Sequence, residues 1–256
     1  MILPRRLTHE GVHPEWIIPD WPAPPHVKAL ITTRAGGVST GAYESFNIGL
    51  STGDDAQAIQ ANRARLRAVL PREPHWLKQV HGARVVDDDT LVGRPEADAC
   101  VARERASVCA VLVADCLPVL FTDRAGSIVA AAHAGWRGLA GGVIENTVQS
   151  LAANGTRAED VLAYLGPAIG PAAFEVGDDV YAAYTQSDPQ TRAAFVPHAR
   201  GKWLADLFSL ARRALARSGV TAVYGGGLCT YSDPDRFYSY RRDKITGRMG
   251  AFIWRE

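Results

Sequence analysis

Residues 96–123, EADACVARERASVCAVLVADCLPVLFTD, carry the strongest structural signal in this chain. From Val108 to Phe121 the apolar residues run almost without interruption, which is typical of a strand buried on both faces of a sheet. Residues 127–138, SIVAAAHAGWRG, follow as a strand of small residues that ends in glycines. Together the two stretches predict the centre of a buried β-sheet.

Outward from this centre, strands and helices alternate irregularly. Residues 143–153 have apolar side chains at helical spacing and precede Asn154-Gly155, which predicts a helix with its C-cap. Similar patterns predict helices over 56–70, from about residue 178 and up to Gly219, and strands over 27–33, 159–166, 236–248, at the C-terminus and on both sides of Gly82. This order predicts an α/β (α+β) fold, a layered sandwich with mixed β-sheets flanked by helices. We expect one domain over residues 1–256, with an irregular Pro- and Trp-rich arm over 1–26.

Composition excludes several classes of protein. The 256 residues include 28 Lys and Arg against 27 Asp and Glu, a formal net charge of +1 that offers no field to hold a nucleic acid or an anionic membrane. The longest apolar run is interrupted by Asp115 and Pro118 and falls short of the roughly 20 residues that cross a bilayer. Four cysteines without a CxxC pair and a start without a signal-peptide pattern indicate a reducing compartment, most simply the cytoplasm.

Two histidines and one cysteine stand where predicted strands give way to loops: His81 in QVHG, Cys116 in ADCLP and His133 in AHAGWRG. Imidazole and thiolate ligands suit zinc, and three protein ligands leave the fourth tetrahedral position open, as in catalytic sites. The three residues are far apart in the sequence, so only the fold can bring them together. The alternatives are buried, hydrogen-bonded histidines and an inert core thiol.

Other polar residues are candidates for binding a substrate. Asp115 ends an apolar strand, where an unpaired carboxylate is costly, so we expect it to hold a substrate or a metal ligand; it could instead cap a helix or pair with an arginine. Arg34, Asn47 and Arg137 lie in or beside glycine-rich turns, where backbone amides can hold an anion. The alternative is that these three residues brace loops.

The segment from Arg236 to Arg248 mixes basic and aromatic residues. Such a mixture can bind single-stranded nucleic acid by stacking. Because the rest of the chain offsets its charge, we expect instead a strand that lines a pocket for a small anionic or phosphorylated ligand.

The ordered motifs of the chain resemble those of the YfiH-like laccase-domain family. The matching stretches are TTRAGGVS…SFNIGLSTGDD, WLKQVHG, ADACV…VLVADCLPVLF, AAHAGWRG, YLGPAIGPAAFEVG and CTYSDPDRFYSYRRDKITGRMGAFIW, which extend from about residue 26 to the C-terminus. The two His and one Cys that hold zinc in the family map onto His81, Cys116 and His133. The resemblance implies a sandwich related to cysteine-hydrolase folds.

The resemblance also implies a bacterial enzyme that phosphorolyses adenosine, inosine and methylthioadenosine and deaminates adenosine. Deamination needs an acid or base near the metal, for which Asp115 and Glu175 are candidates. Phosphorolysis needs groups that hold phosphate, for which Arg34, Arg137 and Arg241 are candidates. The expected partners are therefore a nucleoside and phosphate, with Zn²⁺ as cofactor.

Other labels of the family, polyphenol oxidase and peptidoglycan editing factor, correspond to other chemistry. Cys116, activated by His133 or His81, could be the nucleophile of an amide or peptide hydrolase that edits peptidoglycan precursors. A His₂Cys set also matches a copper site, but a multicopper oxidase needs a histidine-rich cluster, and the chain has seven histidines and no HxH pair. A binding module without enzyme activity has no need for such a set.

Overall fold

The computed structural model describes residues 11–88 and 93–256. The first ten residues of the predicted arm lie outside this range. Residues 11–26 contain turns and an isolated bridge between Ile17 and Ile31, but no helix or regular strand.

The largest sheet among the described residues has six strands and is mixed. In spatial order they are β11 (Ala222–Gly225), β7 (Val161–Leu165), β5 (Leu117–Asp123), β6 (Val129–Ala134), β3 (Ala99–Ala102) and β2 (Val85–Asp87). β11 is parallel to β7 and β2 is parallel to β3, whereas the other neighbours are antiparallel. Every residue of the two middle strands, β5 and β6, is buried, which confirms the predicted buried centre.

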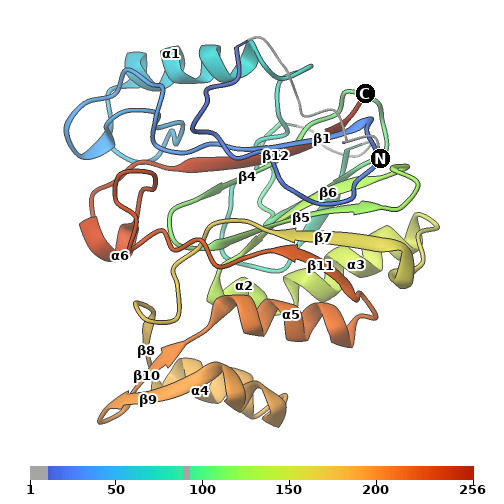
Figure 1. The fold of residues 1–256 in the computed structure, drawn as a ribbon, viewed down its shortest axis with the longest axis vertical. Coiled ribbons are helices and arrows are strands. Elements are labelled where there is room, and N and C mark those ends of the chain that lie inside the picture. The colour runs from blue at the N-terminus through green and yellow to red at the C-terminus, as the bar shows by residue number, and fades with distance from the viewer. Residues whose placement is uncertain (1–10, 89–92) are drawn as a thin grey trace, which may run out of the picture.

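A three-stranded antiparallel sheet lies against one face of the larger sheet (Figure 1). Its strands are β1 (Val27–Ile31), β12 (Met249–Arg255) and β4 (Cys109–Val113). Along β12, Ala251 and Ile253 pack between the two sheets, whereas Phe252 and Trp254 pack on the opposite side with Leu66. Both faces of this sheet are therefore covered, which explains why its strands lack a polar face.

Helices cover the outer faces of both sheets (Figure 1). α1 (Ala56–Arg67) lies over the three-stranded sheet, and α2 (Trp136–Ala140), α3 (Val143–Ala153) and α5 (Leu207–Arg217) lie under the six-stranded sheet. The Asp206 carboxylate accepts hydrogen bonds from the N–H groups of Phe208 and Ser209, and so starts α5 in the way typical of an N-cap. The resulting order of helix, sheet, sheet and helices confirms the predicted layered fold.

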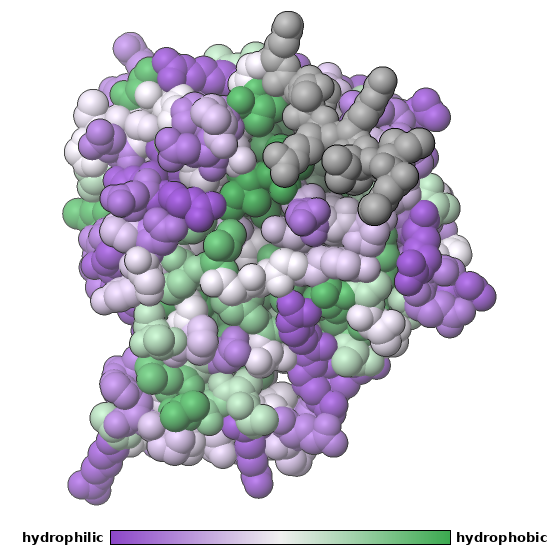
Figure 2. Space-filling view, viewed as in Figure 1, coloured by the Kyte–Doolittle hydropathy of each residue, from purple (hydrophilic) through white to green (hydrophobic). Residues whose placement is uncertain are grey.

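A smaller lobe projects from this body (Figure 1). It contains the sheet of β8 (Glu175–Gly177), β10 (Lys202–Ala205) and β9 (Phe195–Ala199), together with α4 (Asp178–Thr185). Figure 2 shows hydrophilic residues over much of the visible face, with the hydrophobic ones in small patches, one of them on this lobe. Within the described residues, the other helices with given bounds are η1 (Gly41–Tyr43), η3 (Ala158–Asp160), η4 (Pro189–Ala194) and α6 (Tyr240–Asp243).

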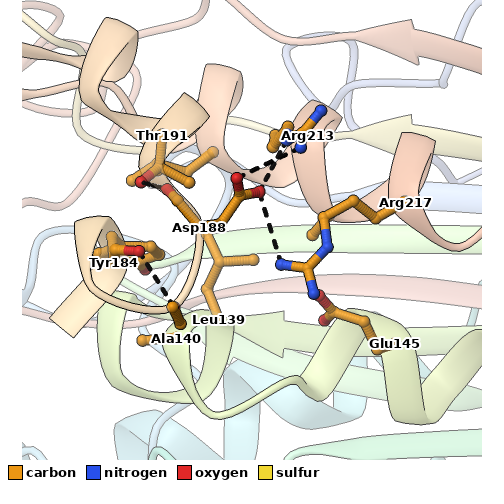
Figure 3. Close-up of a pocket in the computed structure, with 11 residues that line it drawn as sticks. Leu139, Ala140, Glu145, Tyr184, Asp188, Thr191, Arg213 and Arg217 are labelled. Carbon is orange, nitrogen blue, oxygen red and sulfur yellow. Dashed lines mark hydrogen bonds and ion pairs between the residues drawn. The ribbon is translucent and has the colours of Figure 1, made fainter.

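Asp188, between α4 and η4, ties the lobe to α5 (Figure 3). Its Oδ2 atom lies 2.8 Å from Nε of Arg213 and 3.5 Å from Nη1 of Arg217, both on α5. A cavity of about 40 Å³, also lined by Glu145 of α3 and Tyr184 of α4, lies beside these ion pairs. No helix within the described part of the chain is long and apolar enough to cross a membrane.

Three sequence predictions of strands need correction. The apolar run from Val108 to Phe121 is two strands, β4 and β5, separated by a turn at 114–116. Residues 75–80 form only isolated bridges at His75 and Lys78, because the N–H of Val80 is bound by a side chain, the carboxylate of Asp98, instead of a strand. Residues 236–248 are loop and α6, because the Ser239 hydroxyl caps that helix by accepting from the N–H of Arg242.

Candidate metal centre

The structure brings His81, Cys116 and His133 together at one end of the central strands. Their potential ligand atoms all lie within 4.8 Å of one another. The two imidazole rings meet edge to face, with centroids 4.9 Å apart. No other group of three or more His, Cys, Asp and Glu residues within the described residues has such geometry. The predicted convergence of these residues is therefore present in the fold.

Three different segments supply these side chains. Cys116 ends the turn between β4 and β5, and His133 lies inside β6, where it pairs with Pro118 of β5. His81 belongs to an irregular loop and has φ +59°, in the left-handed region that few residues other than glycine adopt. His133 is buried, Cys116 is half-buried and His81 is exposed, so the cluster opens to solvent on the side of His81.

The carboxylate of Asp98 holds two of these three segments. Its Oδ1 atom lies 2.8 Å from Nδ1 of His133 and accepts from the N–H of His81 at 3.0 Å. Its Oδ2 atom accepts from the N–H groups of Gly82 at 2.7 Å and Val80 at 3.2 Å. Asp98 is fully buried, and these bonds hold its pKa below the usual range although burial alone would raise it. These bonds also give the strained backbone of His81 its support.

The contact with Asp98 leaves only one ring nitrogen of His133 for other partners. Because Nδ1 faces the carboxylate, Nε2 is the atom available to a metal ion or to the Cys116 thiol. A histidine whose second nitrogen donates to a carboxylate is the usual arrangement at zinc sites.

The Cys116 thiol and the His133 imidazole shift each other's ionisation. Burial opposes ionisation of the thiol, but the charge of His133 and hydrogen bonds with His133 and His81 outweigh it and lower the pKa of Cys116 to about 6. Burial likewise opposes protonation of His133, but Cys116 and Asp98 raise the pKa of its imidazole to about 9. In the metal-free site these shifts favour a thiolate beside an imidazolium. Thiolate is the form of cysteine that binds metals and acts as a nucleophile, and a metal ion at this site would displace the proton from Nε2 of His133.

The residues present fit a metal ion. Two imidazoles and a thiolate form a donor set that zinc accepts, and they leave a coordination position open. Gly135 keeps the space above them clear, because a Cβ atom at this position would lie 2.7 Å from Sγ of Cys116 and 3.3 Å from Cδ2 of His81.

Asp115 lies beside the cluster, but its carboxylate is occupied. Oδ1 accepts from the hydroxyl of Thr230 at 2.6 Å, and Oδ2 accepts from the N–H of Arg241 at 2.6 Å. The residue has φ +86° at the turn that precedes Cys116. This carboxylate therefore joins the Cys116 turn to the loop over 230–241, and a catalytic role for it remains a prediction.

Arg34 and Asn47 both make extensive contacts with loops. The Arg34 guanidinium donates to the carbonyls of Glu44 and Pro234, at 2.8 Å each. Asn47 is fully buried. Its Oδ1 accepts from the N–H groups of Gly49 and Arg248, and its Nδ2 donates to Thr52 and Asp54. These contacts are those of residues that brace loops, and their binding of a substrate remains a prediction.

The other three predicted substrate-binding residues lie on α2, β8 and α6. Arg137 of α2 is exposed and lies over the ring of Trp136. The Glu175 carboxylate lies 3.6 Å from Nε2 of His198 and 3.9 Å from Nζ of Lys202, both in the lobe. Arg241 donates from Nη1 to the backbone carbonyl of Glu175 at 2.7 Å. Their roles in binding remain predictions.

Sequence reasoning missed Asp98, Gly135 and Arg248 as individual members of this region. Asp98 had a usable signal, since it is a carboxylate within an apolar stretch and the same argument singled out Asp115. Gly135 had none, because its importance depends on what the fold places beside it. Arg248 lies in the basic and aromatic segment that was expected to line a pocket for an anionic ligand, but nothing in the sequence distinguishes it from the other basic residues there.

The chain matches the family model described as multi-copper polyphenol oxidoreductase laccase over residues 28–256. It is 52% identical over 241 residues to a Pseudomonas aeruginosa protein named purine nucleoside phosphorylase, with 93% of this chain and 98% of that protein covered. It is 51% identical over 244 residues to the Escherichia coli purine nucleoside phosphorylase YfiH, with 93% and 98% covered.

Solved structures share the fold. The crystal structure of a Neisseria meningitidis protein superposes with a TM-score of 0.91 at 50% identity and covers 94% of this chain and 99% of its own. The crystal structure of YlmD from Geobacillus stearothermophilus has a TM-score of 0.84 at 32% identity and covers 90% and 92%.

Proposed function

This chain belongs to the multi-copper polyphenol oxidoreductase laccase family, and from that premise we propose that it is a zinc-dependent purine nucleoside phosphorylase. The observation that carries the proposal is the convergence of His81, Cys116 and His133, with Asp98 holding the second nitrogen of His133. The names of the Pseudomonas and Escherichia relatives support the reaction class.

Zinc suits this site better than the copper that the family description names. A multicopper oxidase uses a histidine-rich cluster in addition to a His₂Cys site. Within the described residues, His13, His26, His75 and His198 form no such cluster with each other or with the site. Bound to His81, Cys116 and His133, zinc would act as a Lewis acid and lower the pKa of water.

The proposed phosphorolysis exchanges one bond. An oxygen of phosphate forms a bond to the anomeric carbon of the ribose, the bond from that carbon to the purine nitrogen breaks, and the proton of the hydrogen phosphate ends on the base. The products are a free purine and ribose 1-phosphate. The contribution of the chain is to hold the two reactants in line and to offer positive charge to phosphate.

We propose adenosine deamination, in which water replaces the amino group and releases ammonia, as a second activity of the same site. Asp115 and Glu175 are its proposed acid and base candidates. The Asp115 carboxylate already accepts hydrogen bonds from Thr230 and Arg241. The observed geometry therefore supports deamination less well than phosphorolysis. Nucleosides and phosphate are the proposed partners, in a reducing cytoplasm that keeps Cys116 reduced and available as a thiolate.

Two measurements on the purified protein test the proposal. Elemental analysis is expected to find about one zinc per chain in the wild type and much less in Cys116→Ser. Incubation with adenosine is expected to release adenine only when phosphate is present, and inosine in either case. A wild-type protein free of zinc after metal-replete purification contradicts the metal centre, and adenosine left unchanged with phosphate contradicts the reaction.

A second candidate function is supported by the contacts among Cys116, His133 and Asp98. They correspond to those of a cysteine hydrolase, in which a histidine activates the cysteine nucleophile and an acidic residue orients the histidine. In that reaction Cys116 would attack an amide carbonyl and the amine would leave with a proton from His133. Water would then cleave the resulting thioester, which releases the carboxylic acid and restores Cys116. Amide hydrolysis that persists under a chelator and stops on alkylation of Cys116 would favour this candidate. Loss of activity under the chelator, restored by added zinc, would favour the metal enzyme.

A further inference from the structure

Arg248 lies next to the metal centre because of how the sheets pair. Met249, the first residue of β12, pairs with Val113 at the end of β4, so residue 248 lies level with the turn that carries Asp115 and Cys116. The N–H of Arg248 donates to Oδ1 of Asn47 at 2.9 Å, which ties the arginine to the glycine-rich loop.

The side chain of Arg248 is held in one orientation. Its stem packs against Gly49, where a Cβ atom would lie 2.8 Å from Cγ of the arginine. The Nη1 atom of its guanidinium donates to the carbonyls of Thr246 at 3.0 Å and Gly247 at 2.9 Å. Nε and Nη2 make no hydrogen bond to any residue that the structure describes, so two sides of the planar group remain available.

The charge of this half-buried guanidinium has no acidic partner. Within the described residues Arg248 forms no ion pair, and the nearby Asp115 carboxylate already accepts from Thr230 and Arg241. Burial lowers the pKa of Arg248, and the charges of Cys116, Asp115, Tyr240 and Tyr43 oppose this without forming an ion pair with it. A cation so placed is costly unless an anion joins it.

Arg34 and Arg242 differ from Arg248 in this respect. Arg34 donates to Glu44 and Pro234, and Arg242 pairs with Asp243 and donates to the carbonyls of Thr230, Tyr231 and Phe237. Both guanidinium groups are therefore used within the protein. Arg248 combines a fixed orientation with unused donors beside Cys116.

We propose that Arg248 binds the phosphate co-substrate and holds it beside the metal centre. The inference rests on the proposed phosphorolysis and identifies the residue that positions its second substrate. A guanidinium offers paired N–H donors that match two oxygens of a phosphate, whereas a lysine ammonium offers only a point charge.

Arg248→Gln and Arg248→Lys test the assignment, with Arg192→Gln, an exposed arginine of η4, as the control with the same loss of charge. We expect the KM for phosphate to rise at least about 10-fold in Arg248→Gln, in line with loss of a charged hydrogen bond, and less in Arg248→Lys. The KM for the nucleoside is expected to stay near the wild-type value in all three variants. An unchanged KM for phosphate in Arg248→Gln overturns the inference.

A calorimetric titration separates this inference from the proposed function. Inorganic phosphate is added to the zinc-loaded protein in the absence of nucleoside, and the heat of binding is measured. Phosphate binding that weakens at least about 10-fold in Arg248→Gln and not in Arg192→Gln supports the assignment even if no nucleoside is phosphorolysed. Binding equal in wild type and Arg248→Gln, or absent from the wild type, overturns it. Zinc content and circular dichroism of each variant are measured alongside, and Arg248→Lys provides the readout if Arg248→Gln does not fold.

Discussion

The Nδ1 atom of His133 lies 2.8 Å from the Oδ1 atom of Asp98, a fully buried carboxylate that also binds the backbone of the loop carrying His81. One side chain thereby positions two of the three proposed metal ligands. The same carboxylate makes four hydrogen bonds and accepts in each of them. This pattern fits the ionised form, because a protonated carboxyl group would also need an acceptor for its own O–H.

Asp98→Asn is therefore expected to weaken zinc binding about 10- to 100-fold, the usual cost of removing a carboxylate that supports a metal-bound histidine. The amide nitrogen cannot accept from Gly82 or Val80, so the His81 loop also loses support. Competition with a chromophoric chelator measures the affinity, and Asp179→Asn, an exposed aspartate on α4, is the control. An unchanged affinity would show that Asp98 does not support the metal site.

Gly135→Ala is expected to reduce zinc content and activity together. The new methyl group would lie 2.7 Å from the Cys116 sulfur, and the φ of −64° at Gly135 means that backbone strain is not the cause. Gly82→Ala in the neighbouring loop meets nothing nearer than 3.5 Å and is the matched control for zinc content. Full zinc occupancy in Gly135→Ala would contradict the proposed location of the metal.

Asp115→Asn distinguishes a structural role from a chemical one. Asparagine tolerates the positive φ of this turn, but it replaces one carboxylate oxygen by an NH2 group, so only one of the bonds from Thr230 and Arg241 keeps an acceptor oxygen. We expect the free energy of unfolding to fall by about 1–3 kcal/mol, as measured by urea denaturation. Unchanged stability with lost turnover would instead assign Asp115 to the reaction.

The Asp188 contacts are expected to make stability depend on pH. The hydrogen bond from Arg213 holds the pKa of Asp188 below its usual value in the folded protein. A lowered carboxylate pKa stabilises the fold above the unfolded value of about 3.9 and loses this effect as the pH falls through the folded value. Asp188→Asn should therefore lower the Tm at pH 7.

The difference in Tm between Asp188→Asn and the wild type should shrink as the pH falls below about 4 in a scanning calorimetry series. Glu159→Gln, which removes an exposed ion pair with Arg157, is the control and is expected to change little at any pH. A constant difference in Tm across the series would show that the Asp188 charge is not responsible.

Local patterns in the sequence determined much of the fold. The amphipathic spacing over 143–153 and 207–217 corresponds to α3 and α5, and the apolar stretches 117–123 and 129–134 correspond to the central strands. These predictions succeed because apolar periodicity reports directly on which side chains are buried. The same patterns predicted two strands that are absent from the described residues. In each, a side chain accepts a backbone N–H that a strand would donate to its neighbour: Asp98 accepts from Val80, and Ser239 accepts from Arg242.

By itself the sequence determined the layered α/β class and, through ordered motifs, the three candidate metal ligands. Only the tertiary structure decided what surrounds them. Asp98 contacts His133 across 35 residues and Asp115 contacts Thr230 across 115, while Arg248 reaches the Cys116 turn through the pairing of β12 with β4. Strand register over such separations follows from the packing of whole layers, and local periodicity carries no information about it.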